Sequence, residues 1–422
     1  MFDTSTLKIA GGLAIPMPAM ARVRQTFDVH RLPDLPGAVR EQVLLPDIRR
    51  RIIPGASIAV GVGSRGVANL EELVRALVGA LKEAGARPFV FPAMGSHGGA
   101  TAEGQTRVLA DYGVTEARVG APVRATMDTV EITRMPDGTV LHMDRLAHEA
   151  DGIVLINRIK PHTTVRGPIQ SGVIKMMVIG MGKIAGASIM HTDHGMDRFA
   201  EVLPQAAACL MERIPFLFGI GVVEDAYDHT AHIEALPPET LLTREAALLT
   251  LATAYMPRIC FDDIDVLVID RIGKEISGSG FDPNIAGRNS RGVTGFDRPR
   301  VQKVVVLDLT DQTHGNATGV GMADVITRRL LNRVDFNSTY ANVITSAYLD
   351  GAAIPLVMDT AEDAVRLAVK TLLRVKPEHA RIVRIADTLS LAEIHASEPL
   401  LAEARRHPNL TVVSDPAPMR WG

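Results

Sequence analysis

The sequence predicts an α/β fold of two domains, each with a mainly parallel sheet. Three observations lead to this prediction. The chain has 422 residues, which at roughly 150 residues per domain is enough for two or three domains, each with its own core. Short β-branched apolar runs alternate with segments of helical period, an order typical of strand–helix–strand units. The first unit has a glycine-rich turn between its strand and its helix, as right-handed parallel units do.

The expected elements of the first domain follow this alternation. The strand at 57–60 precedes a helix at 67–85, because Leu70, Leu73, Leu77 and Leu81 recur there at helical spacing. The remaining elements are strands at 87–91, 152–156 and 216–223, helices at 103–112 and 197–211, a hairpin near 136–138, and a glycine-rich segment up to Gly186.

The second domain repeats the pattern after a helical stretch at 245–254. We expect strands at 265–269, 304–307, 352–357 and 380–385, and helices at 321–332 and 360–371. The predicted domains are therefore 1–262 and 263–422, with about 25 C-terminal residues packing back on the first domain. Because ligands of open α/β sheets bind beyond the carboxyl ends of the strands, we expect the active site in a cleft between the domains.

Composition excludes several classes of function. Thirteen His stand against two Cys, Cys209 and Cys260, so a four-thiolate zinc or iron–sulfur site and a disulfide framework are excluded by count. The net charge of −3 and 4% aromatic residues argue against nucleic-acid binding. No apolar run approaches the roughly 18 residues of a membrane span. We expect a cytoplasmic protein with a small-molecule substrate, and the sequence leaves a homo-oligomer open.

The glycine-rich turn contains the pattern G-x-G-x-x-G at Gly61, Gly63 and Gly66. A nicotinamide dinucleotide site would also need an Asp or Glu at the end of the next strand, and that strand ends in FPAMGSH without an acid. Arg65 lies inside the turn at the start of a helix, where a guanidinium and backbone N–H groups can hold a carboxylate or phosphate. We interpret the turn as an anion site; the alternative is a tight turn with a solvated arginine.

Histidines and a lysine follow the other predicted strands and turns. They are His97 in GSHGG, His162 in KPHTT, Lys175 in VIKMM, and His191 with His194 in MHTDHGM. Apolar neighbours favour the uncharged amine of Lys175, which would make it a nucleophile or an attachment point. His191 and His194 are three apart and would share a helix face, so both could ligate one metal.

This order of residues resembles the nickel-pincer lactate racemase family and its wider group of 2-hydroxy acid racemases and epimerases. Family members carry an Arg in a glycine-rich turn, a His after the next strand, a second His before an S-G-G-x-K segment, and a His sixteen residues beyond that Lys. This chain has Arg65, His97, His162, SGVIK ending at Lys175, and His191, with Gly180 five residues after the Lys. The chain has Val62 where the family often has Asp.

The resemblance implies nickel held in a pyridinium-3,5-bisthiocarboxylic acid mononucleotide, the nickel-pincer cofactor. It implies that Lys175 carries this cofactor covalently through a thioamide, and that His191 is the protein's nickel ligand. His97 and His162 would be the two acid/base residues, and Arg65 the clamp on the substrate carboxylate. Gly63, Gly98 and Gly180 are expected beside the cofactor. The implied activity is inversion at C2 of a 2-hydroxy acid.

The second domain offers further polar groups that could contact the substrate. Lys274 follows the strand at 265–269, Arg288 lies in a loop rich in Gly and Asn, and His314 follows the strand at 304–307. The segment FDPN before Arg288 resembles the family's L-D-Q-N. Three alternatives stay open: a sugar-acid isomerase or lyase with a divalent metal on His97, His162 and His191, a nicotinamide-dependent dehydrogenase, and a non-enzymatic binding protein.

Overall fold

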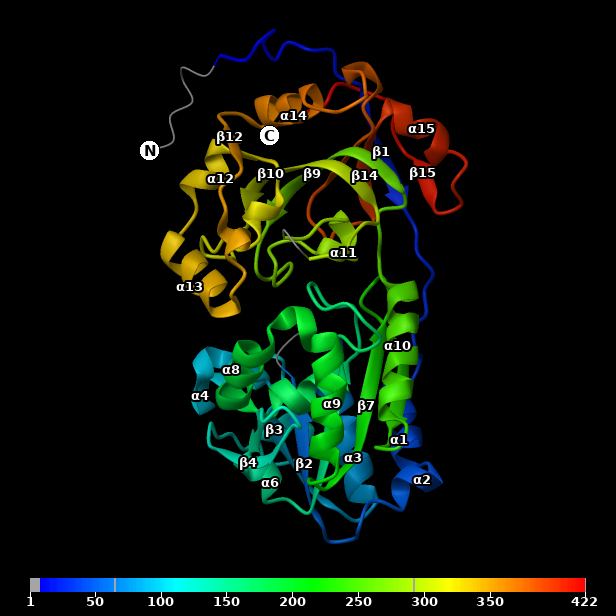
Figure 1. Ribbon diagram of the computed structural model, residues 1–422. Coiled ribbons are helices and arrows are strands. Elements are labelled where there is room, and N and C mark those ends of the chain that lie inside the picture. Colours follow the sequence, from blue (N-terminus) through cyan, green and yellow to red (C-terminus); the bar gives the residue numbers. More distant parts are fainter. Residues whose placement is uncertain (1–7, 64–65, 291–292, 422) are drawn as a thin grey trace. The chain divides into compact units, whose positions relative to one another are not determined.

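The computed structural model describes residues 8–63, 66–290 and 293–421, and their contacts divide the chain into two compact units. One unit is formed by residues 28–256, and the other by residues 8–27 together with 257–421. The contacts therefore assign the N-terminal segment to the unit that the sequence places after residue 262. The predicted fold class, α/β with mainly parallel sheets, is confirmed (Figure 1).

The unit of residues 28–256 has a five-stranded sheet in the order β3-β2-β6-β7-β8. The first four strands in this order are parallel, and β8 is antiparallel to β7. The strands are β2 (Ser57–Val62), β3 (Arg87–Pro92), β6 (Gly152–Arg158), β7 (Phe216–Glu224) and β8 (Thr230–Leu236), and a separate hairpin pairs β4 (Thr129–Arg134) with β5 (Val140–Asp144).

Helices cover both faces of this sheet. The helices are α1 (Leu35–Leu44), α2 (Pro46–Arg49), α3 (Leu70–Glu83), α4 (Ala102–Asp111), α5 (Glu116–Val119), α6 (Arg145–His148), α7 (Val173–Lys175), α8 (Lys183–His194), α9 (Phe199–Met211) and α10 (Leu241–Tyr255). Alternate residues of each strand enter two separate cores, as the two-residue period of a strand requires. One core joins the sheet to α1 and α3, and the other joins it to α7, α9 and α10 (Figure 1).

The second unit has an eight-stranded sheet in the order β12-β11-β10-β9-β13-β14-β1-β15. The strands from β12 to β13 are parallel, and the rest pair antiparallel. The strands are β1 (Met20–Gln25), β9 (Asp263–Ile272), β10 (Arg300–Leu309), β11 (Val325–Thr327), β12 (Leu356–Met358), β13 (Ile382–Ile385), β14 (Glu393–Ser397) and β15 (Leu410–Val412), and the helices are α11 (Pro283–Ala286), α12 (Arg328–Asn332), α13 (Phe336–Ser346), α14 (Ala361–Lys370) and α15 (Glu398–Ala404).

Three expected elements differ from those found. The strand expected at 352–357 is confined to β12 (Leu356–Met358), which follows a 3-10 turn at Leu349–Ala352. The helix predicted at 321–332 is wrong: a short 3-10 turn, strand β11 and helix α12 occupy it. The three residues of β11 are Val, Ile and Thr, and they pair with β10 and β12, so β-branched residues favour the strand. The glycine-rich segment up to Gly186 is also largely helical, since α7, a π-helical turn (Met176–Gly180) and the start of α8 occupy it.

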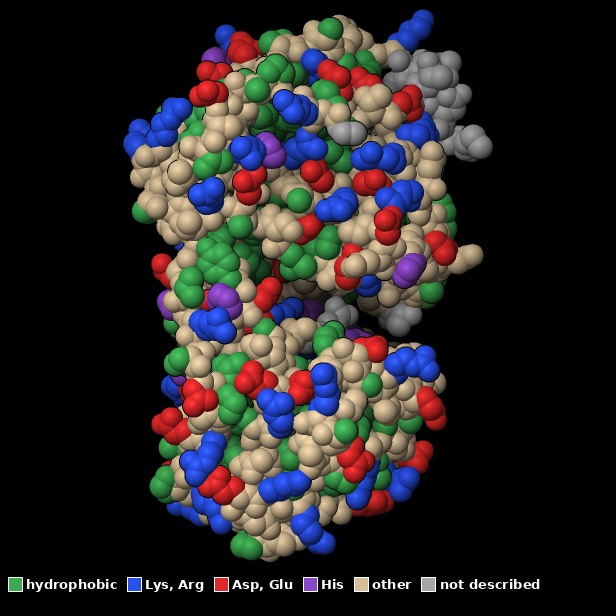
Figure 2. Space-filling model, turned by 180° about the vertical axis from the view of Figure 1, so that it is seen from behind, with side chains coloured by type: hydrophobic (Ala, Val, Ile, Leu, Met, Phe, Trp, Pro, Cys, Tyr) green, Lys and Arg blue, Asp and Glu red, His purple; other side chains and the backbone are tan. Residues whose placement is uncertain are grey.

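No single helix in the described part of the chain has the length and hydropathy of a membrane span. Only a bent pair, Val173–Gly180 with Lys183–His194 at an angle of 101°, meets those criteria jointly. Acidic and basic side chains are interspersed over the face of each unit that Figure 2 shows.

Candidate functional site

The candidate site lies at the carboxyl edge of the five-stranded sheet, where the chain changes direction. From β2 it passes to β3 on one side, and later to β6 on the other side of β2. The loops that follow β2 and β6 therefore diverge, and such a switch point is where open α/β sheets bind ligands. A Cβ placed on Gly63, directly after β2, would lie 3.0 Å from Met176 Cε and 3.4 Å from Asn157 Oδ1. The glycine thus lets the turn meet both the end of β6 and the helix of Lys175.

The far end of the glycine-rich turn is held by a buried carboxylate. Glu224, at the end of β7, accepts a hydrogen bond from the backbone N–H of Ala68 at 2.6 Å and forms an ion pair with Arg158. Arg65, the predicted carboxylate clamp, lies outside the described residues.

His162 and Lys175 are in direct contact. The Nε2 atom of His162 lies 2.7 Å from Nζ of Lys175, although thirteen positions separate the two residues in the sequence. The loop between β6 and α7 makes this contact, because Gln170 Oε1 accepts the backbone N–H of His162 at 2.8 Å and also a bond from Arg166 at 3.2 Å. The loop is thereby folded around the imidazole.

The hydrogen bonds of His162 define the charge state of this pair. Its Nδ1 accepts the backbone N–H groups of Thr164 and Val165, at 3.0 and 3.1 Å. An Nδ1 that accepts carries no proton, so the proton of the imidazole is on Nε2. The Nε2–H group then donates to Lys175, and only an uncharged amine has a lone pair to accept it. This arrangement favours a neutral imidazole beside an amine in its uncharged form.

The backbone before Lys175 is held from two sides. Asn157 donates from Nδ2 to the carbonyl oxygen of Gly172 at 2.8 Å, and the buried carboxyl of Glu245 accepts the N–H of Ile174 at 3.0 Å. A Cβ on Gly172 would lie 2.4 Å from Glu245 Oε1, so a larger residue there would displace this buried carboxyl. Burial raises the pKa of Glu245 to about 8, and this carboxyl is therefore mainly protonated at neutral pH.

Glu245 and Asn157 were not singled out from the sequence. Glu245 is expected within a helix, and the apolar residues around it (EAALLTLA) could have indicated a carboxyl on the buried side of that helix. Nothing in the sequence around Asn157 indicates a contact with Gly172, which is distant along the chain.

His191 lies near the end of α8 and is partly buried. Its ring is tilted by 41° against the ring of Phe199, with 4.9 Å between the centroids. Burial lowers the pKa of His191, and Lys175 lowers it further whenever its amine is protonated. The lowered pKa of His191 favours the neutral imidazole, which is the form that ligates metals.

His194 has a different role from the second metal ligand that its spacing allows. It is buried, and its Nε2 lies 3.0 Å from Oγ1 of Thr139 and 3.7 Å from a carboxylate oxygen of Asp137, both in the β4–β5 hairpin. These contacts fix the end of α8 on the hairpin. Within residues 8–63, 66–290 and 293–421, no three His, Cys, Asp or Glu side chains gather as a metal site.

His97 lies in the turn after β3, at the same edge of the sheet. Gly98 has φ of +64°, and a Cβ there would lie 2.6 Å from the backbone N of Gln105, so the position requires glycine. The neighbouring Gly95 N–H donates to Gly180 O at 3.0 Å. A Cβ on Gly180 would lie 2.5 Å from Ala93 O. The His97 turn therefore packs directly on the π-helical turn that follows Lys175.

The second unit separates its three predicted substrate residues. Lys274 follows β9, and its backbone N–H donates to Thr313 Oγ1 at 3.2 Å, which brings Lys274 near the exposed His314 after β10. Lys274 Nζ donates to Asn342 Oδ1 at 2.6 Å. Arg288 instead binds Asp324 and the carbonyl oxygen of Gln302, at the opposite end of β10. At ~3.3 Å per residue, the ten residues of β10 span about 30 Å. This length separates Lys274 and His314 at one end of the strand from Arg288 at the other.

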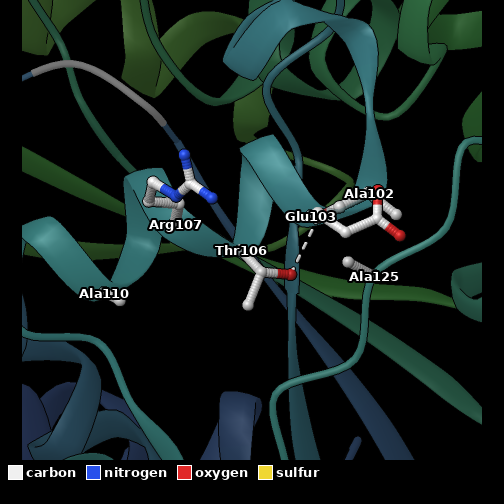
Figure 3. Close-up of a pocket in the computed structure, with 6 residues that line it drawn as sticks. All are labelled: Ala102, Glu103, Thr106, Arg107, Ala110 and Ala125. Atoms are coloured by element: carbon white, nitrogen blue, oxygen red, sulfur yellow. Dashed lines mark hydrogen bonds between the residues drawn. The ribbon is translucent and has the colours of Figure 1, made fainter.

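Two surface hollows of the first unit lie outside this cluster. One, of about 510 Å³, is lined by α4 and Ala125 (Figure 3), and its polar lining is limited to Glu103, Thr106 and Arg107. The other, of about 450 Å³, lies between residues 31–36, the start of α3 and the turn between β7 and β8. Neither contains a residue of the His162–Lys175–His191 cluster.

Comparisons with known proteins give a family model that matches part of the chain, and two solved structures with a similar fold. A model described as a domain of unknown function, DUF362, matches residues 63–240, the span that contains the cluster. No curated protein matches this chain. The lactate racemase apoprotein from Thermoanaerobacterium thermosaccharolyticum is similar in structure, with 13% identity, a TM-score of 0.59, and coverage of 88% of this chain and 99% of that one. A Thermotoga maritima protein of a structural genomics consortium is similar at 12% identity and a TM-score of 0.51, over 87% of this chain and 99% of that one.

Proposed function

We propose that this chain is a racemase or epimerase that inverts C2 of a 2-hydroxy acid with a nickel-pincer nucleotide carried on Lys175. The observation that carries the proposal is the contact between His162 and Lys175, which favours an uncharged amine. The fold shared with a lactate racemase apoprotein supports it.

The residues of the cluster fit such a cofactor by their chemistry. A thioamide can form only from an uncharged amine, and a metal–imidazole bond requires a neutral His. Lys175 and His191 meet these two requirements. A pincer that brings its own sulfur ligands needs few ligands from the protein, which agrees with a chain of thirteen His and only two Cys. When bound, the cofactor would accept a hydride from C2 and return it.

The two acid/base residues would manage the proton of the substrate hydroxyl. Loss of a hydride from C2 together with the hydroxyl proton leaves a planar 2-keto acid, which can be reduced again on either face. One imidazole on each side is then sufficient, and His97 and His162 are the proposed pair. Arg65 is proposed to bind the substrate carboxylate.

Attachment at Lys175 would also release His162 for this task. In the unloaded chain, the Nε2–H group of His162 donates to the amine. The nitrogen of a thioamide has no lone pair available to accept that bond. Once the linkage has formed, the Nε2–H group of His162 could donate to a substrate oxygen instead. His162 would then be available as an acid/base residue only in the loaded enzyme.

The test is to produce the chain in a host that makes the cofactor and to measure its intact mass and nickel content. We expect a covalent adduct and one equivalent of nickel in the wild type, and no adduct in Lys175→Ala. His191→Ala should retain the adduct and lose nickel, because the two residues have different roles. A bare mass without nickel in the wild type, or an adduct in Lys175→Ala, would overturn the proposal.

A second measurement uses the unloaded chain. An ordinary lysine at pH 7 has about one amine in 2,500 uncharged. We expect limiting amounts of an amine-reactive reagent to modify Lys175 before the exposed Lys82, as peptide mass spectrometry would show, and His162→Leu to abolish this preference. Equal labelling of Lys175 and Lys82 would contradict the assigned charge state.

A further inference from the structure

A buried lysine outside the proposed cofactor contacts connects the segments that carry His97 and His191. Lys183 is the first residue of α8, its side chain is 0% exposed, and its backbone φ is +52°. A buried ammonium is strongly unfavourable unless it is fully paired, and a positive φ at a residue other than glycine adds backbone strain. Such a residue needs a reason other than stability.

The ammonium of Lys183 contacts three separate segments. It donates to the carbonyl oxygen of Pro92 at the end of β3 and, at 2.9 Å, to Oε1 of Gln105 in α4. It also lies 3.0 Å from Oδ2 of Asp144 at the end of β5, whose side chain is 0% exposed as well. Burial lowers the pKa of Lys183 and raises that of Asp144, and the attraction between the two opposes both shifts.

Gln105 extends this network to the turn of His97. Its Nε2 donates to the carbonyl oxygens of Gly95 and His97, at 2.8 and 3.2 Å, while its Oε1 accepts from Lys183. The amide is 0% exposed, so water does not replace these bonds. The orientation of Gln105, and with it the backbone of the His97 turn, therefore depends on Lys183.

The same lysine fixes the start of the helix that carries His191. Lys183 joins that end of α8 to Asp144 of the hairpin, and His194 joins the other end to Thr139. His191 is one turn before His194, about 12 Å along the helix from Lys183. A helix held at both ends on one hairpin keeps this imidazole in one position.

We propose that Lys183 is a positioning residue of the candidate site, which sets the His97 turn through Gln105 and the His191 helix through Asp144. This inference rests on the proposed function only for the roles of the two histidines. The network itself is a property of the unloaded chain, so it can be tested without activity.

The test compares three variants in the unloaded protein by hydrogen exchange and by the histidine NMR signals. Lys183→Met with Asp144→Leu removes both buried charges together, because a single substitution would leave the other charge unpaired. Gln105→Met breaks only the branch to His97. Arg40→Met with Glu83→Leu removes an exposed ion pair and is the matched control.

In Lys183→Met/Asp144→Leu we expect exchange at residues 93–98 and 183–194 to accelerate at least ten-fold, with α3 unchanged and the His97 and His191 signals shifted. Gln105→Met should accelerate 93–98 and shift His97 alone. The control should resemble wild type. Uniform acceleration throughout the unit, or no change at 93–98, would overturn the inference.

A second readout is the activity of the loaded enzyme. In Lys183→Met/Asp144→Leu we expect kcat to fall at least ten-fold, with KM within two-fold of the wild-type value. If hydrogen exchange accelerates locally in the variants but the loaded wild-type protein has no racemase activity, the proposed function is rejected and the Lys183 network stands.

Discussion

Single residues of the candidate site carry charge states that differ from those they have in water. The Nζ atom of Lys175 lies 2.7 Å from Nε2 of His162, and the buried carboxyl of Glu245 accepts the backbone N–H of Ile174, the residue before Lys175. A charged amine and a charged carboxylate would both be costly in such surroundings. These surroundings therefore favour the neutral forms of Lys175 and Glu245, which suit covalent attachment and metal ligation better than ionic binding.

Glu245 gives the unloaded protein a specific dependence of stability on pH. Burial raises the pKa of Glu245 from 4.5 to about 8, so the folded chain keeps a proton that the unfolded chain releases. Its stabilising effect is complete below pH 4.5 and is lost as pH rises through about 8. We expect Glu245→Gln, which still accepts the Ile174 N–H, to gain roughly 1 kcal/mol per pH unit relative to wild type between pH 5 and 8.

Urea unfolding at pH 5, 6, 7 and 8 measures this difference, and Glu234 provides the control. Although burial opposes it, hydrogen bonds from Arg244 and His232 lower the pKa of Glu234 to about 2. Its contribution is therefore lost only as pH falls below 4.5. The offset between Glu234→Gln and wild type should be constant from pH 5 to 8. A constant offset for Glu245→Gln as well would show that this carboxyl is ionised in the folded chain.

The sequence identifies the reactive residues of the site better than those that hold them. His97, His162, Lys175 and His191 each follow a strand or a glycine-rich turn, and the structure brings His162 and Lys175 into contact. Their roles stay predictions. Gln105 and Glu245 lie in ordinary helical segments, and only tertiary contacts give them their roles. Local pattern does not contain such information, since the partner of each lies in another element.

At the level of elements, the π-helical turn after Lys175 depends on one close backbone contact. Gly180 is buried, and its hypothetical Cβ would lie 2.5 Å from Ala93 O. We expect Gly180→Ala to lower the free energy of unfolding by about 1 to 3 kcal/mol, because a backbone carbonyl must move. Urea unfolding of the unloaded protein measures this loss.

Gly79→Ala is the matched control for this substitution. Gly79 lies within α3 and has no atom within 4 Å of a hypothetical Cβ, so alanine there should stabilise the helix by up to about 1 kcal/mol. The resemblance stated from the sequence implies a different role for Gly180, a contact with the cofactor rather than packing on Ala93. Unchanged stability of Gly180→Ala, with loss of cofactor loading, would favour that role over packing.

The sequence predicts long elements with a clear hydrophobic period correctly. The conformation of short segments depends instead on the strands beside them. Helix α3 shows its period in four leucines and was found where it was expected. The segment at 321–332 contains apolar residues that fit a helix, yet Val325, Ile326 and Thr327 form a strand because β10 and β12 lie on either side of them. Three residues are too few to show a two-residue period, and sheet pairing then decides the conformation.

The organisation of the whole molecule was the least accessible from sequence. β1, near the N-terminus, pairs with both β14 and β15 near the C-terminus, and so lies inside the eight-stranded sheet. Nothing in the six residues MARVRQ indicates partners at least 369 positions away. A split of the chain at one point therefore assigns residues 8–27 to the wrong unit, whatever the position of that split.

This topology predicts how fragments of the chain behave. Residues 28–256 contain their own sheet, with covering helices on both faces, so we expect the fragment 28–256 to fold alone and to unfold cooperatively in urea. The fragment 263–422 lacks β1, and β14 and β15 would then lose the strand between them. Their unpaired backbone groups and exposed apolar residues should leave it partly folded and prone to aggregate.

Addition of a peptide of residues 8–27 provides the decisive comparison. Because β1 inserts between β14 and β15, the peptide should restore a cooperative transition to the fragment 263–422, as circular dichroism during urea titration would show. A peptide with Val23→Asp, which places a charge at a position that is 0% exposed, should fail to do so. Cooperative folding of 263–422 without the peptide would show that β1 is dispensable, and that the two units are separable at a single point of the chain.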